Sequence, residues 1–307
     1  MSQELDPVAL DALLDRIPST SRRPREVVDL PGGLTNHNLK VTTPDGTVVV
    51  RMFAPGGELL AIDREHEYAN SVAAALAGVG APVVDYLPAD NVLVVGWLEG
   101  RTYTDADLAD ASNLPRVATA CRALHSGPRF VNDFDMFAIQ AGYLAIVHAH
   151  GFRLPDRYLD LAPQAERVRW ALAVQPAPTV PCNNDLLAGN FVDDGERLWL
   201  IDYEYSGNND ACFELGNIWS EAALPLDHLD ALVTAYYGRP RRSKVARARL
   251  LGWMSKYGWT LWASIQAGTS TLDFDFWAWG MEKYQRALAE VDGRDFDAVL
   301  DAAAGED

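Results

Sequence analysis

The sequence contains few cysteines and few basic residues. Its three cysteines, Cys121, Cys182 and Cys212, are far apart and form no CxxC pair. An odd number of scattered cysteines argues against a disulfide framework and against paired-thiolate zinc or redox sites. The chain carries 26 Lys and Arg against 43 Asp and Glu, a net charge of −17. Such a chain repels phosphate backbones and anionic lipids unless basic residues cluster, and no basic cluster is present, so we expect neither nucleic acid nor a membrane as partner.

Long hydrophobic runs and targeting signals are also missing. The first residues, MSQELDPVALDALLDRIP, are acidic where a signal peptide has a basic region followed by an apolar one. The longest weakly polar run, VAAALAGVGAPVV, is shorter than the ~20 residues of a spanning helix and contains Pro82. The GxxxxGKS/T motif of P-loop proteins is absent. We therefore expect a folded cytoplasmic protein with 49% hydrophobic residues for its core, and no feature of the sequence sets its oligomeric state.

The pattern of the sequence changes once along the chain. Up to about residue 97, short β-rich runs alternate with turn signals such as Pro44-Asp45-Gly46, and one helix is predicted after Asp63, a suitable N-cap. Beyond that point helical periodicity dominates, apart from one predicted hairpin around Asp193-Asp194-Gly195. We predict an α+β fold, with a small antiparallel sheet and one helix in residues 1–97 and a larger, mainly helical part in residues 98–307.

Residues 181 to 217, PCNNDLLAGNFVDDGERLWLIDYEYSGNNDACFELGN, gather carboxylates and asparagines around two short apolar runs. Asp185 and Asn190 lie on the loop entering the predicted hairpin and Asp202 follows its second strand, so the turn brings both loops together. A carboxamide and a carboxylate at one point suit Mg²⁺ carrying the phosphates of ATP, with Asn190 and Asp202 as ligands. Asp185 is then the base that accepts a proton from a nucleophile.

The spacing of these residues supports the same interpretation. The phosphoryl-transfer site of protein kinases has a base Asp, an Asn five residues later and a metal Asp beyond a hairpin. Here Asn190 follows Asp185 by five residues, and Asp202 follows it by seventeen, after the predicted hairpin. A turn-rich surface loop is the alternative interpretation of a D-x-x-x-x-N match. The apolar LWLI strand before Asp202 and the small sheet upstream favour the kinase.

CNNDLLAGN followed by LIDYEYSGNNDACFELGN resembles the choline/ethanolamine kinase branch of the aminoglycoside phosphotransferase superfamily. The resemblance extends over nearly the whole chain, since GGLTNHN is similar to the family's phosphate loop, VVVR to its nucleotide-anchoring strand and WTLWASIQAGTSTLDFDF to its C-terminal helical region. It implies the two-lobed protein-kinase-like fold, with residues 1–97 as the N-lobe and 98–307 as the C-lobe. One position departs from the family, which usually has His where this sequence has Asn183; that His supports the backbone of the loop, a role that a carboxamide is able to fill.

Four residues of the first lobe are expected at the nucleotide phosphates. In GGLTN, Gly32 and Gly33 permit positive φ and close approach of the backbone, while Thr35 and Asn36 are able to donate to phosphate oxygens. Taken alone, a Gly-Gly pair is more often only a turn. The run VLVVGWLEG is interpreted as the connector between the lobes, where backbone groups of Val95 to Trp97 pair with adenine.

Arg51 is the predicted anchor for the ATP phosphates. It ends VVVR on the same strand face as Val49, where a cation needs a partner. Glu67 or Glu65 on the following helix is able to supply that partner, as the Lys-Glu pair does in protein kinases, and the resemblance favours Glu67. The alternative is that Arg51 extends from the surface into solvent.

The acceptor side is predicted from aromatic residues near the C-terminus. Trp259 and Trp262 share one face of a helix and, together with Trp279, are able to enclose a trimethylammonium group through cation–π attraction; an aromatic core is the equally weighted alternative. The resemblance implies that Glu204 and Glu221 supply the acidic side chains for the amine.

These side chains offer more aromatic surface than hydrogen-bond acceptors, which favours choline over ethanolamine as the acceptor. A kinase for another amine-bearing alcohol, such as an aminoglycoside or thiamine, is the alternative enzyme. A nucleotide-binding pseudoenzyme is the alternative of a different class, and it is motivated by Asn183.

Overall fold

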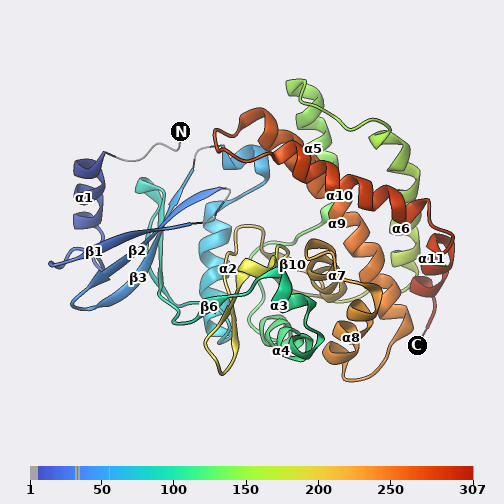
Figure 1. The fold of residues 1–307 in the computed structure, drawn as a ribbon, viewed down its shortest axis with the longest axis horizontal. Helices are drawn as coiled ribbons and strands as arrows, with labels where there is room; N and C mark the ends of the chain where they lie inside the picture. Colours follow the sequence, from blue (N-terminus) through green and yellow to red (C-terminus); the bar gives the residue numbers. More distant parts are fainter. Residues whose placement is uncertain (1–5, 32, 34, 55, 307) are drawn as a thin grey trace.

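The chain forms a small sheet-containing lobe and a larger helical lobe (Figure 1). The computed structural model describes residues 6–31, 33, 35–54 and 56–306. The elements up to β5 form the N-lobe, at the left of Figure 1, and the elements from β6 onward form the C-lobe. This arrangement confirms the predicted α+β, kinase-like architecture.

The N-lobe sheet has five antiparallel strands in the order β1-β2-β3-β5-β4. The turn predicted at Pro44-Asp45-Gly46 joins two of them, with Thr43 opposite Gly46, whose φ of 139° a residue with a Cβ rarely adopts. Asn91, at φ 56°, turns the chain into the last strand. The strands are β1 (Glu26–Leu30), β2 (Asn36–Thr43), β3 (Gly46–Phe53), β4 (Val83–Leu87) and β5 (Val92–Gly96).

Two helices accompany this sheet. α2 (Arg64–Leu76) begins where predicted, because the Asp63 side chain accepts hydrogen bonds from the amides of Glu65 and His66 at 3.0 and 3.1 Å. The prediction of a single helix was incomplete, since α1 (Pro7–Arg16) packs Leu13 and Leu14 with the valines of β2, β3 and β5 in a small separate core. A 3₁₀ turn, η1 (Gly57–Leu60), precedes α2, and another, η2 (Pro88–Asp90), separates β4 from β5.

The C-lobe is helical, with two small sheets at the side that faces the N-lobe. The hairpin predicted around Asp193-Asp194-Gly195 is present as β8 and β9, with β6 as a third strand, and a second sheet pairs β7 with β10. The strands are β6 (Arg101–Thr102), β7 (Thr179–Cys182), β8 (Phe191–Asp193), β9 (Leu198–Leu200) and β10 (Gly207–Asp210). The helices are α3 (Asp105–Ala109), α4 (Leu114–His125), α5 (Met136–His150), α6 (Ala162–Val174), α7 (Ala211–Glu221), α8 (Leu226–Tyr237), α9 (Arg242–Thr269), α10 (Phe276–Val291) and α11 (Phe296–Ala304). The 3₁₀ turns are η3 (Ala111–Asn113), η4 (Tyr158–Leu161) and η5 (Ala188–Asn190).

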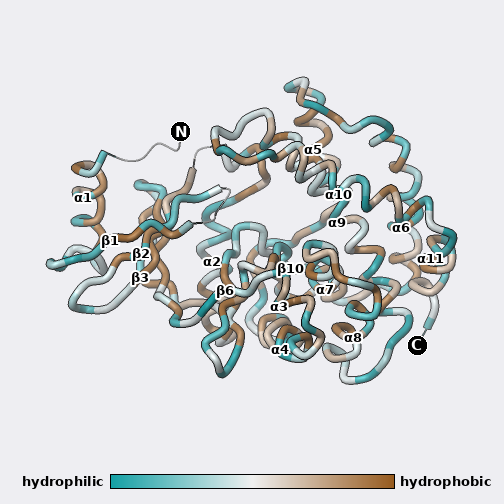
Figure 2. Tube along the Cα trace, in the orientation of Figure 1, coloured by the Kyte–Doolittle hydropathy of each residue, from teal (hydrophilic) through white to brown (hydrophobic). Residues whose placement is uncertain are grey.

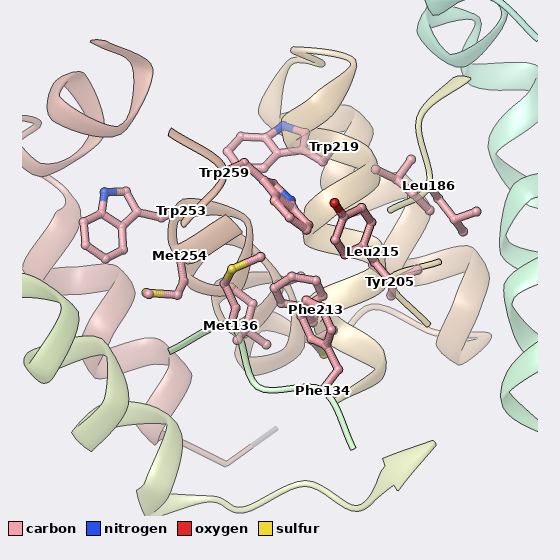
Figure 3. Packing of buried hydrophobic residues seen from close by; sticks show 14 of the residues in the cluster. Phe134, Met136, Leu186, Tyr205, Phe213, Leu215, Trp219, Trp253, Met254 and Trp259 are labelled. Atoms are coloured by element: carbon pink, nitrogen blue, oxygen red, sulfur yellow. The ribbon is translucent and has the colours of Figure 1, made fainter. Parts of the chain in front are cut away.

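Helix α9 is the centre of the C-lobe. Every residue from 250 to 266 is buried, and the helix packs against α5, α7, α10 and α11. Figure 3 shows its Trp253, Met254 and Trp259 among side chains contributed by α5, α7 and the segment that contains Leu186 and Tyr205. Figure 2 shows the corresponding gathering of hydrophobic residues along the C-lobe helices and on the strands of the N-lobe. In the part of the chain that the structure describes, no helix combines the length and the apolar character that a membrane span requires.

Helices α7 and α9 cross with almost no space between their backbones. A Cβ on Gly216 would lie 2.0 Å from the carbonyl oxygen of Ala248, and a Cβ on Gly252 would lie 2.5 Å from the carbonyl oxygen of Gly216. Two facing glycines therefore allow this crossing. The position of α7 depends on it, and α7 carries residues of the site described below.

We predict that Gly216→Ala lowers the free energy of unfolding by about 3 kcal/mol, because the new methyl group meets backbone that has no rotamer to change. Urea denaturation measures the effect. Gly142→Ala is the matched control: it lies within α5, its Cβ would meet nothing within 4 Å, and we expect it to raise stability by about 0.5–1 kcal/mol. Unchanged stability in Gly216→Ala would contradict the close crossing.

Candidate functional site

The loop between β7 and β8 is fixed by buried hydrogen bonds. The amides of Asn183 and Asn184 donate to the two carboxylate oxygens of Glu214, at 2.8 and 2.7 Å, and Glu214 is fully buried in the first turn of α7. Asn184 adopts a φ of 67°, and its side-chain amide donates to the carbonyls of Cys182 and Tyr205. These bonds set the backbone of the loop at Asp185.

Asn183 connects this loop to the segment that follows β9. Its Nδ2 donates to the carbonyl oxygens of Ile201 and Asp202 at 3.2 and 2.6 Å, and its Oδ1 accepts from the amide of Asp185 at 3.1 Å. The expectation that a carboxamide supports the loop at this position is confirmed. Asn183 thus fixes the backbone of Asp185 relative to that of Asp202.

The two predicted metal ligands lie on the loops joined in this way. Asn190 donates a hydrogen bond from Nδ2 to the carbonyl of Asp185 at 2.8 Å, so Oδ1 is the atom that would coordinate an ion, and its own carbonyl accepts from the amide of Ile201 at 3.0 Å. Asp202 follows with a φ of 65°. A carboxamide oxygen and a carboxylate suit Mg²⁺, which takes few protein ligands and completes its shell with water and phosphate oxygens. The donor set therefore fits the predicted ion.

Arg51 lies buried between the lobes. Its Nη2 is 2.7 Å from Asp202 Oδ1 and 3.2 Å from Glu67 Oε1, so of the two predicted partners the structure selects Glu67. Glu65 instead accepts a hydrogen bond from Tyr86. Burial acts to lower the pKa of Arg51, but the Asp202 and Glu67 carboxylates outweigh it and the pKa is raised. The guanidinium is thus a permanent cation at the interlobe boundary, next to a cavity of about 30 Å³ lined by both lobes.

The predicted phosphate-loop residues contact a carboxylate of the other lobe. Gly32 lies outside the described residues, while Gly33 has a φ of 115°. Thr35 Oγ1 donates to the Glu204 carboxylate at 2.7 Å and Asn36 Nδ2 donates to it at 2.9 Å. Arg64 Nη1 lies 3.2 Å from the same carboxylate. The donors expected at phosphate oxygens therefore converge on one anionic group.

Glu204 is placed at the lobe boundary by these contacts. Its hydrogen-bond partners belong to the N-lobe, not to the predicted aromatic group. Burial raises its pKa to about 7, the neighbouring Asp202 and Glu67 carboxylates act in the same direction, and Arg51 and Arg64 oppose them. The side-chain contacts of Glu204 therefore connect the two lobes, and they do not include the tryptophans of the predicted amine site.

The predicted connector has its amides already engaged. The amides of Gly96 and Trp97 donate to the carbonyls of Pro82 and Thr47, at 2.8 and 3.2 Å, so neither is available to adenine. The Trp97 ring lies under the ammonium of Lys40, whose Nζ is 3.9 Å from the ring centroid. A contact between adenine and the carbonyl group of Trp97 stays a prediction.

The predicted tryptophans form one aromatic group that includes a tyrosine. The rings of Trp262 and Trp279 meet edge to face with centroids 5.5 Å apart, and Trp262 Nε1 donates to the Tyr205 hydroxyl at 2.7 Å. Tyr205 in turn meets Trp259 edge to face at 4.9 Å. Sequence reasoning missed Tyr205, although it stands three residues after Asp202. Trp259 is buried in the core of Figure 3, whereas Trp279 is half-buried.

Asp185 lies close to the acidic groups of both sides of the site. Burial raises the pKa of its carboxyl well above the usual range, and Glu221, Asp202 and Glu204 raise it further, whereas Lys283 lowers it. Glu221 itself is ion-paired with Lys283 of α10, a residue that sequence reasoning also missed. Among the described residues, Asp185 is the carboxylate of this group that has no basic side chain within ion-pair distance.

Comparisons with known proteins identify the family of the chain. The model of the phosphotransferase enzyme family, APH, matches residues 26–253. A probable ethanolamine kinase of Arabidopsis thaliana is 26% identical over 82% of this chain and 76% of its own length, and the LicA protein of Haemophilus influenzae is 28% identical over 76% and 72%. The crystal structure of a choline/ethanolamine kinase family protein from Mesorhizobium loti is 31% identical, covers 96% of this chain and 98% of its own, and superposes with a TM-score of 0.84. The chain therefore belongs to the phosphotransferase enzyme family and, within it, to the choline/ethanolamine kinase family.

Proposed function

We propose that this protein transfers the γ-phosphoryl group of ATP to the hydroxyl of a small amino alcohol of the choline and ethanolamine type. The observation that carries the proposal is the position of Asp185. Its carboxylate has no ion-pair partner among the described residues, the carboxylates of Glu221 and Asp202 act electrostatically on it, and its backbone is fixed by Asn183. A carboxylate in this position is free to act as a base between a phosphate site and an amine site.

Asp185 would accept the proton of the acceptor hydroxyl. Burial and the surrounding carboxylates disfavour its charged form, which makes the ionised carboxylate a stronger base than an exposed aspartate. Asn190 and Asp202 would hold Mg²⁺, which supplies positive charge to the ATP phosphates. Arg51, kept charged and fixed by Asp202 and Glu67, would add a second cation on the same side.

The N-lobe donors would contribute to phosphate binding. Thr35 and Asn36 converge on the Glu204 carboxylate, so their side chains are already oriented towards an anion. Gly33 supports this orientation, since a Cβ there would approach the carbonyl oxygen of Asn36 to 2.9 Å. We infer that phosphate oxygens of the nucleotide exchange with Glu204 for these donors.

The amine side of the proposed site consists of Tyr205, Trp262, Trp279 and Glu221. These groups are buried or half-buried and closely packed, as a small ammonium requires. An aminoglycoside needs a broad acidic groove instead. The acidic residue Asp227, at the start of α8, is exposed and contacts His228, and so does not line such a groove. The geometry thus favours a small amino alcohol over the larger alternatives.

We expect Asp185→Asn to lower kcat by about 10²–10⁴-fold, because the carboxamide cannot accept the proton of the acceptor hydroxyl. The affinity for ATP·Mg²⁺ should change little, since Asp185 acts on the acceptor. Steady-state kinetics and calorimetry measure the two quantities. Asp301→Asn, an exposed carboxylate of α11, serves as the control and should retain parental kcat. Parental turnover in Asp185→Asn would remove Asp185 from the base role.

Asp202→Ala should abolish the dependence of nucleotide affinity on Mg²⁺, because the variant lacks the carboxylate that holds the ion near the phosphates. Calorimetric titration of ATP with and without Mg²⁺ measures this dependence. Asp202 also contacts Arg51, so Glu67→Gln is the comparison: it weakens the other partner of Arg51 and should leave the Mg²⁺ dependence in place. If Asp202→Ala and the parent respond equally to Mg²⁺, Asp202 is not a metal ligand.

Substitutions of Asn183, whose side chain supports the loop of Asp185, test whether the protein is an active kinase or a pseudoenzyme. We expect Asn183→His to keep kcat within roughly tenfold of the parent, about 1.4 kcal/mol, because the imidazole is able to hydrogen-bond the same loops. Asn183→Ala should lose more, since it leaves the carbonyls of Ile201 and Asp202 without this donor. Nucleotide binding without turnover in the parent and in Asn183→His would establish the pseudoenzyme instead.

A further inference from the structure

A lysine of the protein itself lies in the proposed amine site. The Lys283 side chain is only 3% exposed, and its ammonium pairs with Oε2 of Glu221, whose side chain is 4% exposed. The same ammonium lies over the face of Trp279, with Nζ 4.0 Å from the ring centroid. One carboxylate and one π face that would attract a substrate ammonium are therefore already in contact with a cation.

This pairing stabilises two groups that are both costly to bury. An isolated ammonium or carboxylate in this environment carries a large desolvation penalty, which the short ion pair and the ring face offset. Glu221 ends α7 and Lys283 lies in the middle of α10, so the pair also joins two helices. Lys283 is thus a fixed part of the site and not a mobile surface residue.

The pair changes what the site offers to a quaternary ammonium. Such a group has no N–H to donate, so it depends on aromatic faces and on uncompensated negative charge. Lys283 covers one face of Trp279 and neutralises Glu221. Glu204, the other predicted acidic residue, is paired with Arg64 and hydrogen-bonded by Thr35. Both predicted carboxylates are therefore already compensated.

The hydrogen-bond acceptor that is still free in this site favours an ammonium that carries N–H groups. Oε1 of Glu221 is buried and has no hydrogen-bond partner among the described residues. An unsatisfied buried acceptor is unfavourable, and a donor that reaches it gains both the hydrogen bond and the relief of that penalty. A primary ammonium is able to donate to Oε1 while Lys283 stays on Oε2, whereas a trimethylammonium cannot.

We propose that Lys283 is a specificity-determining residue: by occupying Glu221 and Trp279 with its own ammonium, it disfavours quaternary acceptors and selects primary ammonium alcohols of the ethanolamine class. The inference rests on the proposed function and refines its substrate. It reverses the preference for choline that the number of tryptophans suggested, because the sequence does not show that one of their faces is occupied.

The first test uses the unmodified protein. Ethanolamine, its N-methyl and N,N-dimethyl derivatives and choline are compared as acceptors at saturating ATP and Mg²⁺. We expect kcat/KM to fall along the series as N–H groups are replaced by methyl groups, by at least tenfold from first to last. Equal values for choline and ethanolamine, or a preference for choline, would overturn the inference even if no variant folds.

The second test replaces the lysine. Lys283→Met keeps the length of the side chain and removes its charge, which frees Trp279 and leaves Glu221 negative; we expect the choline to ethanolamine ratio of kcat/KM to rise at least tenfold. Lys283→Arg keeps the charge and should keep the parental ratio. Lys256→Met is the matched control, since Lys256 is equally buried, pairs with Glu290 at 2.7 Å and lies over Trp219 instead.

The outcomes separate this inference from the proposed function. An unchanged ratio in a folded Lys283→Met variant would overturn the role of Lys283 and leave the amino alcohol kinase intact. A shift of the same size in Lys256→Met would also overturn it: Lys256 contacts Glu290 and Trp219 and acts on Glu221 only through longer-range charge, so the ratio would not depend on the contacts of Lys283. If the parent phosphorylates no member of the series, both the proposed function and the inference fail.

Discussion

The site depends on one buried carboxylate, Glu214. It accepts hydrogen bonds from two consecutive amides of the loop that carries Asp185, and it does so from within the rigid start of α7. His125 Nε2 lies 3.7 Å from Glu214 and 3.6 Å from the sulfur of Cys182, whose thiol has its pKa raised by burial. The buried carboxylate of Glu214 therefore joins the loop backbone to helix α7 away from solvent. The backbone geometry around Asp185 depends on these hydrogen bonds.

The carboxylates of the site divide into compensated and uncompensated groups. Asp202 and Glu67 share Arg51, Glu204 is paired with Arg64, and Glu221 is paired with Lys283, each within ion-pair distance. This internal compensation allows an acidic protein to place several carboxylates near the position proposed for ATP. Asp185 differs from them among the described residues, because it has no ion-pair partner there, and this difference supports its proposed role as the base.

Local patterns indicated the fold around the proposed catalytic residues better than the contacts of the acceptor side. The spacing of Asp185, Asn190 and Asp202 and a hairpin signal predicted how their loops meet because all three lie within one short segment, while their chemical roles stay predictions. Arg51 was identified because a cation in a strand pattern needs a partner, and Glu67 supplies it. Helix α1 was missed although Leu10, Leu13, Leu14 and Ile17 follow the helical spacing i, i+3, i+4, i+7. The contacts of Glu204 with Thr35 and of Lys283 with Glu221 join distant parts of the chain, and periodicity carries no information about such pairs.

The close crossing of α7 over α9 has a consequence for the size of the acceptor. Glu214 and Glu221 are seven residues apart on α7, two helical turns, which corresponds to a rise of about 10 Å. The first residue fixes the loop of the proposed base and the second belongs to the proposed ammonium site, so a single rigid helix sets the span between the reacting hydroxyl and the amine. Because Gly216 and Gly252 let the backbones of α7 and α9 pack directly against each other, this span would be fixed, and the proposed site would then select acceptors by the length of the carbon chain between hydroxyl and amine.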